Sequence, residues 1–219
     1  MWNQKVFEKS YSNNPKYLVV LLHGYGANAR DLIELSEYFN KSLPNSHFIA
    51  PNAIENWEGG FPDAYQWFSL SNGITRKSFE ETSDNIKSSN QALQEFINEK
   101  LQDLDIAPKN LFIIGFSQGA MMAKYQGLIS EEKIGGVIAL SGRLILPDLT
   151  GEEINSKPNI CLIHGRNDDV VEFSNFLESK KILESLDIEF EAHGLDNLGH
   201  SINLEGIEKA SNFLKKQSQ

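Results

Sequence analysis

The sequence predicts an α/β protein with a mainly parallel central sheet and helices on both faces. Three observations support this class: short apolar runs of strand length recur, segments with helical periodicity separate them, and the two kinds alternate from residue 17 to the end. Alternation of this kind gives parallel strands joined by helices that cover the two faces of the sheet. At 219 residues, we expect one domain over residues 1–219.

Six apolar runs are predicted to be strands, most of them fully buried. They span residues 17–22, 48–50, 111–114, 136–140, 160–163 and 188–192. The clearest helix spans residues 83–104, because its apolar residues fall on one stripe at a period of 3.6. Further helices are predicted at residues 120–128, 173–183 and 204–214, the last with Asn203 as its N-cap.

Residues 51–78 interrupt this alternation. They combine three glycines with five aromatic residues and show no regular periodicity. Long irregular segments in compact domains are often lids or binding loops, so we expect a lid or binding loop here. The alternative, an aromatic-rich loop that packs on the core, stays open at this point.

Composition restricts the partners and the compartment. The net charge of −10 disfavours a nucleic-acid partner, which needs lysine and arginine to neutralise phosphates. Cys161 is the only cysteine and lies in an apolar run, so we expect a buried core residue and no intrachain disulfide. No secretory signal and no stretch long enough for a transmembrane segment is found, and we expect a cytoplasmic protein.

A possible nucleophile lies at the end of the third predicted strand. Residues 111–119, Leu-Phe-Ile-Ile-Gly-Phe-Ser-Gln-Gly, place an apolar run directly before a Gly-x-Ser-x-Gly pentapeptide, and a predicted helix follows. This order is typical of a nucleophile elbow. Gly115 and Gly119 fit it, since a Cβ at either position would clash with nearby backbone. We therefore predict Ser117 as a nucleophile that is exposed at the start of a helix.

A serine nucleophile needs a base within hydrogen-bond reach and an acid that orients the base. Asp168 follows the fifth predicted strand, at the carboxyl end where open α/β sheets place their sites, and is the predicted acid. Asp169 is the alternative acid, and a simple turn role for both stays open. His200, in the loop before the terminal helix, is the predicted base. His193 is its rival, although its place at a strand end favours a structural role.

Acyl transfer also needs donors for the oxyanion. The backbone N–H of Gln118 follows the predicted nucleophile, and the N–H of Tyr25 lies in the glycine-bearing turn at residues 23–28, so these two are the predicted donors. Gly24 and Gly26 are also explained if they only make a strand-to-helix turn. Phosphate binding by this turn is weaker, because no Gly-Lys-Ser or Gly-Lys-Thr follows it.

Four segments carry a family resemblance: residues 22–28 (Leu-His-Gly-Tyr-Gly-Ala-Asn), 115–120 (Gly-Phe-Ser-Gln-Gly-Ala), 164–168 (His-Gly-Arg-Asn-Asp) and 199–200 (Gly-His). Together they resemble the carboxylesterase, lysophospholipase and acyl-protein thioesterase family of α/β hydrolases, over nearly the whole chain. The resemblance implies the α/β-hydrolase fold and acyl substrates: small carboxylic esters, lysophospholipids or acylated proteins. It also implies that no cofactor and no metal is needed.

The resemblance and the residues together predict a mechanism. His200 takes the proton of Ser117 as the serine attacks the acyl carbonyl, and Asp168 orients His200. Water then hydrolyses the acyl-Ser117 intermediate, and activity should fall as His200 protonates at low pH. An apolar acyl groove is expected to be lined by Trp67, Phe68, Phe61 and Trp57.

Two other functions remain open for this sequence. One is a peptidase or amidase that uses the same three residues. The other is a non-catalytic ligand-binding or membrane-binding protein on a hydrolase scaffold. The sequence also leaves open a homodimer and a transient contact with a membrane surface.

Overall fold

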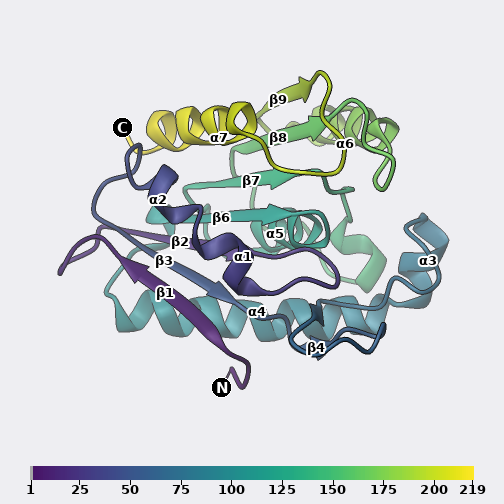
Figure 1. Cartoon of the computed structure of the whole chain (residues 1–219), viewed down its shortest axis with the longest axis horizontal. Helices are drawn as coiled ribbons and strands as arrows, with labels where there is room; N and C mark the ends of the chain where they lie inside the picture. Colours follow the sequence, from purple (N-terminus) through teal and green to yellow (C-terminus); the bar gives the residue numbers. More distant parts are fainter. Residues whose placement is uncertain (1) are drawn as a thin grey trace.

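The computed structural model describes residues 2–219, in which seven strands form one twisted sheet (Figure 1). The strands are β1 (Val6–Ser10), β2 (Tyr17–Leu22), β3 (Ser46–Pro51), β6 (Leu111–Phe116), β7 (Gly136–Leu140), β8 (Ile160–Gly165) and β9 (Phe190–Leu195). Their order in the sheet is β1-β3-β2-β6-β7-β8-β9. All neighbours are parallel except β1, which runs antiparallel to β3. The predicted α/β class with a mainly parallel sheet is confirmed.

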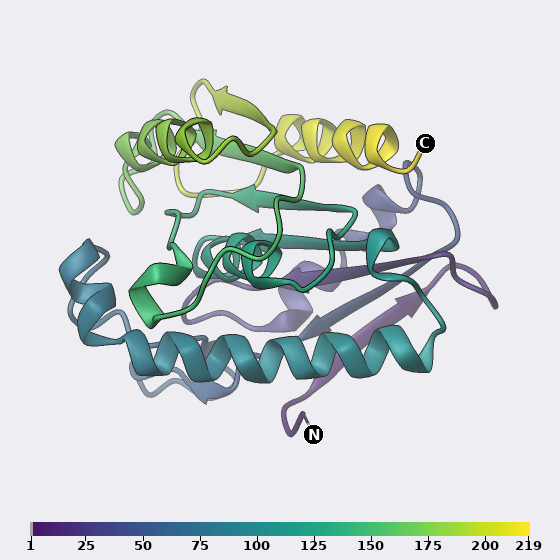
Figure 2. The same ribbon diagram turned by 180° about the vertical axis from the view of Figure 1, so that it is seen from behind.

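Helices cover both faces of the sheet, as Figures 1 and 2 show from opposite sides. One face carries α1 (Ala29–Ile33), α2 (Ser36–Phe39) and α7 (Leu204–Gln217). The other carries α4 (Ser83–Asp103), α5 (Gln118–Ile129) and α6 (Phe173–Ser185). Shorter elements are α3 (Arg76–Glu81) and the 3-10 helices η1 (Pro108–Asn110) and η2 (Pro147–Thr150).

Strand β2 shows how the two helix layers are held. Its successive side chains point to opposite faces, so Leu18 and Val20 belong to the core under α4 and α5, while Val19 and Leu21 belong to the core under α1 and α7. All four are 0% exposed, as expected for a parallel strand covered on both sides. This burial fixes the strand ends, and with them the loops that carry the site.

The predicted helices are present with small differences in length. The predicted cap of the terminal helix is confirmed, because the Asn203 side chain accepts a hydrogen bond from Gly206 N at 2.8 Å. A similar cap begins α1, where the Asn28 side chain accepts from Arg30 N at 3.0 Å. Within residues 2–219, no helix combines the length and the apolar character needed to cross a membrane.

Several strands are longer than predicted, and the differences at β1 and β9 have a clear physical reason. Strand β1 was not predicted, because Glu8 and Lys9 interrupt the apolar pattern by which the other strands were found. These charged residues are tolerated because β1 lies at the edge of the sheet and pairs only with β3. The last strand begins two residues later than predicted. Ile188 N donates to Leu183 O at the end of α6, and this bond delays entry into the sheet until Phe190.

Segment 51–78, which interrupts the alternation of strands and helices, is more regular than expected. It contains a short hairpin of β4 (Glu55–Asn56) and β5 (Tyr65–Gln66), and α3 begins at its end. The hairpin is tied to the turn after β2, because Gly26 N donates to Tyr65 O and Tyr65 N donates to Ala27 O, both at 2.9 Å. Segment 51–78 is therefore anchored beside the carboxyl end of β2. Whether it moves as a lid stays a prediction.

Candidate active site

Ser117 lies in a tight turn between β6 and α5, at the carboxyl edge of the sheet. Its backbone has φ 54° and ψ −118°, a conformation that non-glycine residues rarely adopt and that is held here by its surroundings. A Cβ on Gly115 would collide with the Gly119 carbonyl, and one on Gly119 would collide with the Leu22 carbonyl. The predicted reason for both glycines is confirmed.

Ser117 is less open than predicted. It directly precedes α5, but only 9% of its surface is exposed. Gly24 packs so closely that a Cβ there would lie 3.3 Å from the Cβ of Ser117, and His200 bonds to the hydroxyl. The expectation of an exposed serine is thus corrected: Ser117 is largely buried, and its hydroxyl is bonded to His200.

The structure brings Ser117, His200 and Asp168 together from three loops. His200 Nε2 is 2.9 Å from Ser117 Oγ, and His200 Nδ1 is 2.8 Å from Asp168 Oδ2. Because the carboxylate can only accept, Nδ1 carries the proton, which leaves Nε2 free to accept from the serine hydroxyl. The alternative acid, Asp169, is exposed, and the rival His193 lies in β9 with its Nε2 3.7 Å from Glu191.

Asp168 is held as a carboxylate by several donors. Its Oδ1 accepts from Val170 N at 3.0 Å and Val171 N at 2.8 Å, which orients the side chain. Burial acts to raise the pKa of Asp168, but the bond from His200 and these N–H groups outweigh it, so its pKa lies below the ordinary value. His164 Nε2 also approaches Asp168 Oδ2 at 3.3 Å while bonding to Val171 O at 2.7 Å. Burial lowers the pKa of His164.

The two predicted oxyanion donors lie next to residues that contact or adjoin the serine. Gln118 is the first residue of α5, so its backbone N–H has no partner within the helix. Tyr25 lies in the turn after β2, between Gly24, which packs on Ser117, and Gly26, which is bonded to β5. Their use as donors stays a prediction.

Comparison with known proteins adds the family. The model of the phospholipase/carboxylesterase family matches residues 4–218. The chain belongs to this family. It is accordingly a hydrolase with the α/β-hydrolase fold, as its sequence segments suggested.

Individual relatives agree with this assignment. Acyl-protein thioesterase 1 of Kluyveromyces lactis is 30% identical over 216 residues, covering 92% of both chains. Acyl-protein thioesterase 1 homolog 1 of Dictyostelium discoideum is 31% identical and covers 90% of this chain and 89% of the relative. Among solved structures, the crystal structure of esterase PE8 has a TM-score of 0.87 and 34% identity, with 97% of each chain covered.

The pair Trp67 and Phe68 does not line an open groove in this family member. Both side chains are 0% exposed and belong to the core under α4 and α5. Trp67 Nε1 donates to His23 O at 2.9 Å, so even its polar atom faces inward. Both rings therefore present no surface to solvent in this structure, and their contact with an acyl chain stays a prediction.

These buried rings have a structural connection to the serine. The Gln118 side chain accepts from Trp67 N at 3.0 Å and donates to Phe68 O at 2.7 Å. With the indole bond to His23 O, residues 67–68 connect the start of α5 to the turn after β2. The sequence offered no signal for this role beyond the aromatic pair itself.

The other two predicted aromatic residues lie further out. Phe61 is 69% exposed and stacks on the half-buried Trp57, with ring centroids 5.7 Å apart. Trp57 in turn meets Tyr25 edge to face at 5.8 Å. Contact of these rings with a substrate stays a prediction.

Two buried basic residues were missed by the sequence reasoning. His23 accepts from Ala53 N through Nε2 and donates to Gly24 O through Nδ1, and burial lowers its pKa to about 4. Lys124 in α5 is 0% exposed and donates to Gly142 O at 2.6 Å, and burial lowers its pKa to about 7. Since a Cβ on Gly142 would lie 2.6 Å from Ser117 O, Lys124 supports the backbone against which the elbow packs.

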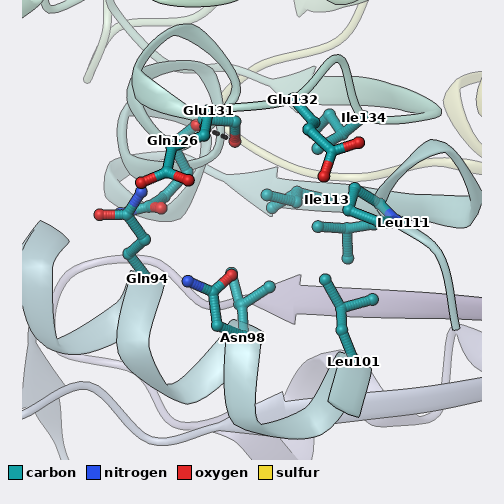
Figure 3. Close-up of a pocket in the computed structure, with 12 residues that line it drawn as sticks. Gln94, Asn98, Leu101, Leu111, Ile113, Gln126, Glu131, Glu132 and Ile134 are labelled. Carbon is teal, nitrogen blue, oxygen red and sulfur yellow. Dashed lines mark hydrogen bonds between the residues drawn. The ribbon is translucent and has the colours of Figure 1, made fainter. Parts of the chain in front are cut away.

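A further cavity lies at the opposite edge of the sheet (Figure 3). Gln94, Asn98 and Leu101 of α4 face Glu131 and Glu132 beyond α5, around the start of β6. Its volume of about 90 Å³ is well below the usual size of a ligand site. Among residues 2–219, no three His, Cys, Asp or Glu side chains are grouped as metal ligands, and Cys161 is buried as predicted.

Proposed function

We propose that this hydrolase cleaves carboxylic esters or thioesters through an acyl-Ser117 intermediate. The observation that carries the proposal is the continuous chain Ser117 Oγ, His200 Nε2, His200 Nδ1 and Asp168 Oδ2, with contacts of 2.9 and 2.8 Å. A serine hydroxyl is a weak nucleophile by itself, and a neutral imidazole oriented by a buried carboxylate is the arrangement that activates it.

The reaction proceeds in two steps. In the first, Ser117 Oγ bonds to the acyl carbon while its proton passes to His200 Nε2, and the Tyr25 and Gln118 N–H groups stabilise the oxyanion. The acyl carbon then loses the alcohol or thiol, which takes the proton from His200. In the second step, water gives a proton to His200, attacks the acyl carbon and releases the acid, and the proton returns to Ser117.

The substrate class follows from the family and the relatives. Members named acyl-protein thioesterase and esterase support an acyl ester or thioester substrate. We propose acylated small molecules, lysophospholipids and acylated proteins as the range to test, with the ester and the thioester as alternatives of the same chemistry. A cytoplasmic location is part of the proposal, supported by a lone cysteine that is buried and free.

Hydrolysis of p-nitrophenyl esters from acetate to palmitate tests this function. We expect Ser117-dependent activity, with Ser117→Ala reducing kcat/KM by about 10⁴-fold or more. Ser174→Ala, at an exposed serine of α6, is the matched control and should keep wild-type rates. Labelling by a fluorophosphonate provides a second measurement. A folded wild type that neither hydrolyses any ester nor reacts with the label would be a binding protein, and the proposal would be wrong.

A further inference from the structure

An open groove lies beside His200, on the face of the sheet covered by α1 and α7. Its volume is about 370 Å³, within the usual size of small-molecule sites. The walls come from Leu32 of α1, Leu35 between α1 and α2, Phe116 before the serine, and Ile202 after His200. Leu35, Phe116 and Ile202 are only partly buried, so the groove presents apolar surface to solvent.

The groove is continuous with the reacting groups. His200 is one of its lining residues, and its ring lies 4.9 Å from that of Phe116, the residue before Ser117. Gly24, which packs on Ser117, forms another part of the wall. Trp67 and Phe68, whose backbone is bonded to the Gln118 side chain next to the serine, are fully buried and offer no open surface. A substrate of more than a few atoms therefore finds accessible apolar surface on the His200 side.

The proton transfer by His200 determines which part of the substrate lies in the groove. His200 Nε2 takes the proton of Ser117 and must return it to the departing oxygen or sulfur, so the leaving group has to lie next to Nε2 when the bond to the acyl carbon breaks. Atoms attached to that oxygen or sulfur then extend past the imidazole. We propose that the groove binds the leaving group, and that the enzyme prefers alcohols or thiols with an apolar portion.

Charge restricts the leaving group further. Of the described residues that line the groove, Asp31 alone carries a fixed charge, and it is exposed at the rim. Its neighbour Arg30 is directed elsewhere, with its guanidinium 5.7 Å from the ring of Phe7. An anionic group near Asp31 is disfavoured and a cationic one is favoured. The groove thus fits a neutral or cationic leaving group with an apolar stem.

This inference rests on the proposed function. Two series of esters distinguish a failure of the inference from a failure of the proposed function. The first series varies the alcohol of acetate esters from ethanol to hexanol, and the second varies the acid of ethyl esters from acetate to hexanoate. We expect kcat/KM to rise about tenfold or more along the alcohol series, because each added methylene is buried in the groove. A flat alcohol series in an active enzyme would overturn the inference alone. Loss of Ser117-dependent hydrolysis in both series would overturn the proposed function.

Variants of Leu35 test whether the preference for longer alcohols arises in the groove. Leu35→Trp fills the groove and should remove the preference for hexyl over ethyl acetate, while Leu35→Ala enlarges it and should extend the preference to longer alcohols. Leu177→Trp, at an exposed leucine of α6 outside the groove, is the control and should leave the alcohol preference as in the wild type. A preference that survives both Leu35 variants unchanged would place the alcohol elsewhere.

The role of Asp31 has its own measurement. Acetylcholine and 3,3-dimethylbutyl acetate have nearly the same shape, but only the first carries a positive charge. The ratio of their kcat/KM values should fall several-fold in Asp31→Asn, while both esters remain substrates. Glu34→Gln, at an exposed acidic residue that pairs with Lys9, is the matched control and should leave the ratio unchanged. An unchanged ratio in Asp31→Asn would remove the charge preference from the proposal.

Discussion

The two sides of Ser117 are covered in opposite ways. Towards α4 and α5, Trp67 and Phe68 are packed in the core, with both side chains 0% exposed. Towards α1 and α7, the half-buried Leu35 and Ile202 leave a groove of about 370 Å³. The side that is richest in aromatic residues is therefore the sealed one.

This difference shows that an aromatic cluster in a sequence can indicate a packed core rather than an open binding surface. A large ring buries much apolar area, and an indole needs one hydrogen-bond acceptor, so a ring that finds both inside the protein becomes part of the core. Trp67 finds its acceptor in His23 O. Open surface instead arises where medium-sized aliphatic side chains line a gap between loops, as at Leu35. Such residues have no distinctive sequence signal.

Asp168→Asn tests the residues between the two sides of Ser117, because either side can bind a substrate productively only if these residues react. The amide group would donate to His200 Nδ1 and force the proton to Nε2, where it can no longer accept from Ser117. We expect kcat to fall about 10⁴-fold. Ester hydrolysis at neutral pH measures this loss.

Asp169→Asn is the matched control for this variant. Asp169 is exposed and adjacent in sequence, so its replacement should leave activity within about twofold of wild type. Equal losses in the two variants would contradict the assignment of Asp168 as the acid. Circular dichroism of both variants shows whether the fold is retained.

The fold could be predicted because its signal is local. Buried parallel strands such as β6 and β8 appear as apolar runs, and the cap of α7 is visible as Asn203 before the helical stripe. Strand β1 could not be found in this way. It lies at the sheet edge with exposed Glu8, so its strand identity depends on pairing with β3, a contact between segments far apart in the sequence.

For the candidate site, too, local sequence signals could be recognised and contacts between distant segments could not. Ser117 has a motif with a steric reason for each glycine, and the order of acid and histidine follows the strands. Lys124 and the link from Gln118 to Trp67 were not predictable, because they depend on which side chains meet in three dimensions. The groove at Leu35 was missed for the same reason.

Trp67→Ala opens the side of Ser117 that is buried under α4 and α5. Removing this fully buried ring leaves a cavity and breaks the bond to His23 O, so we expect the free energy of unfolding to fall by about 3–5 kcal/mol. Urea unfolding monitored by circular dichroism measures the change. Activity should also fall, because the turn that carries Tyr25 loses its connection to α5.

Phe61→Ala provides the contrast within the same segment. Phe61 is 69% exposed and only stacks on Trp57, so its removal should change the free energy of unfolding by less than about 0.5 kcal/mol. A similar loss in both variants would show that the aromatic residues of segment 51–78 act as one unit. The distinction between a sealed core and an outer aromatic pair would then be wrong.

His23 contacts both sides of Ser117, and its contribution to stability depends on pH. Its ring lies 5.5 Å from that of Trp67 and also lines the open groove. Burial lowers its pKa to about 4 in the folded protein, compared with about 6.5 in an unfolded chain. Between these values the unfolded state binds more protons, so stability falls as pH drops from about 6.5 to 4 and this contribution is constant below. The full loss amounts to about 3 kcal/mol.

Urea unfolding of wild type and His23→Gln at about pH 7 and pH 4.5 isolates this contribution. Other titrating groups act alike in both proteins, so the stability difference between them should shrink by about 2–3 kcal/mol at the lower pH. The free energy of unfolding of His23→Gln could instead fall as much as that of wild type on acidification. Water would then reach His23 from the groove, and His23 would be less buried than the structure indicates.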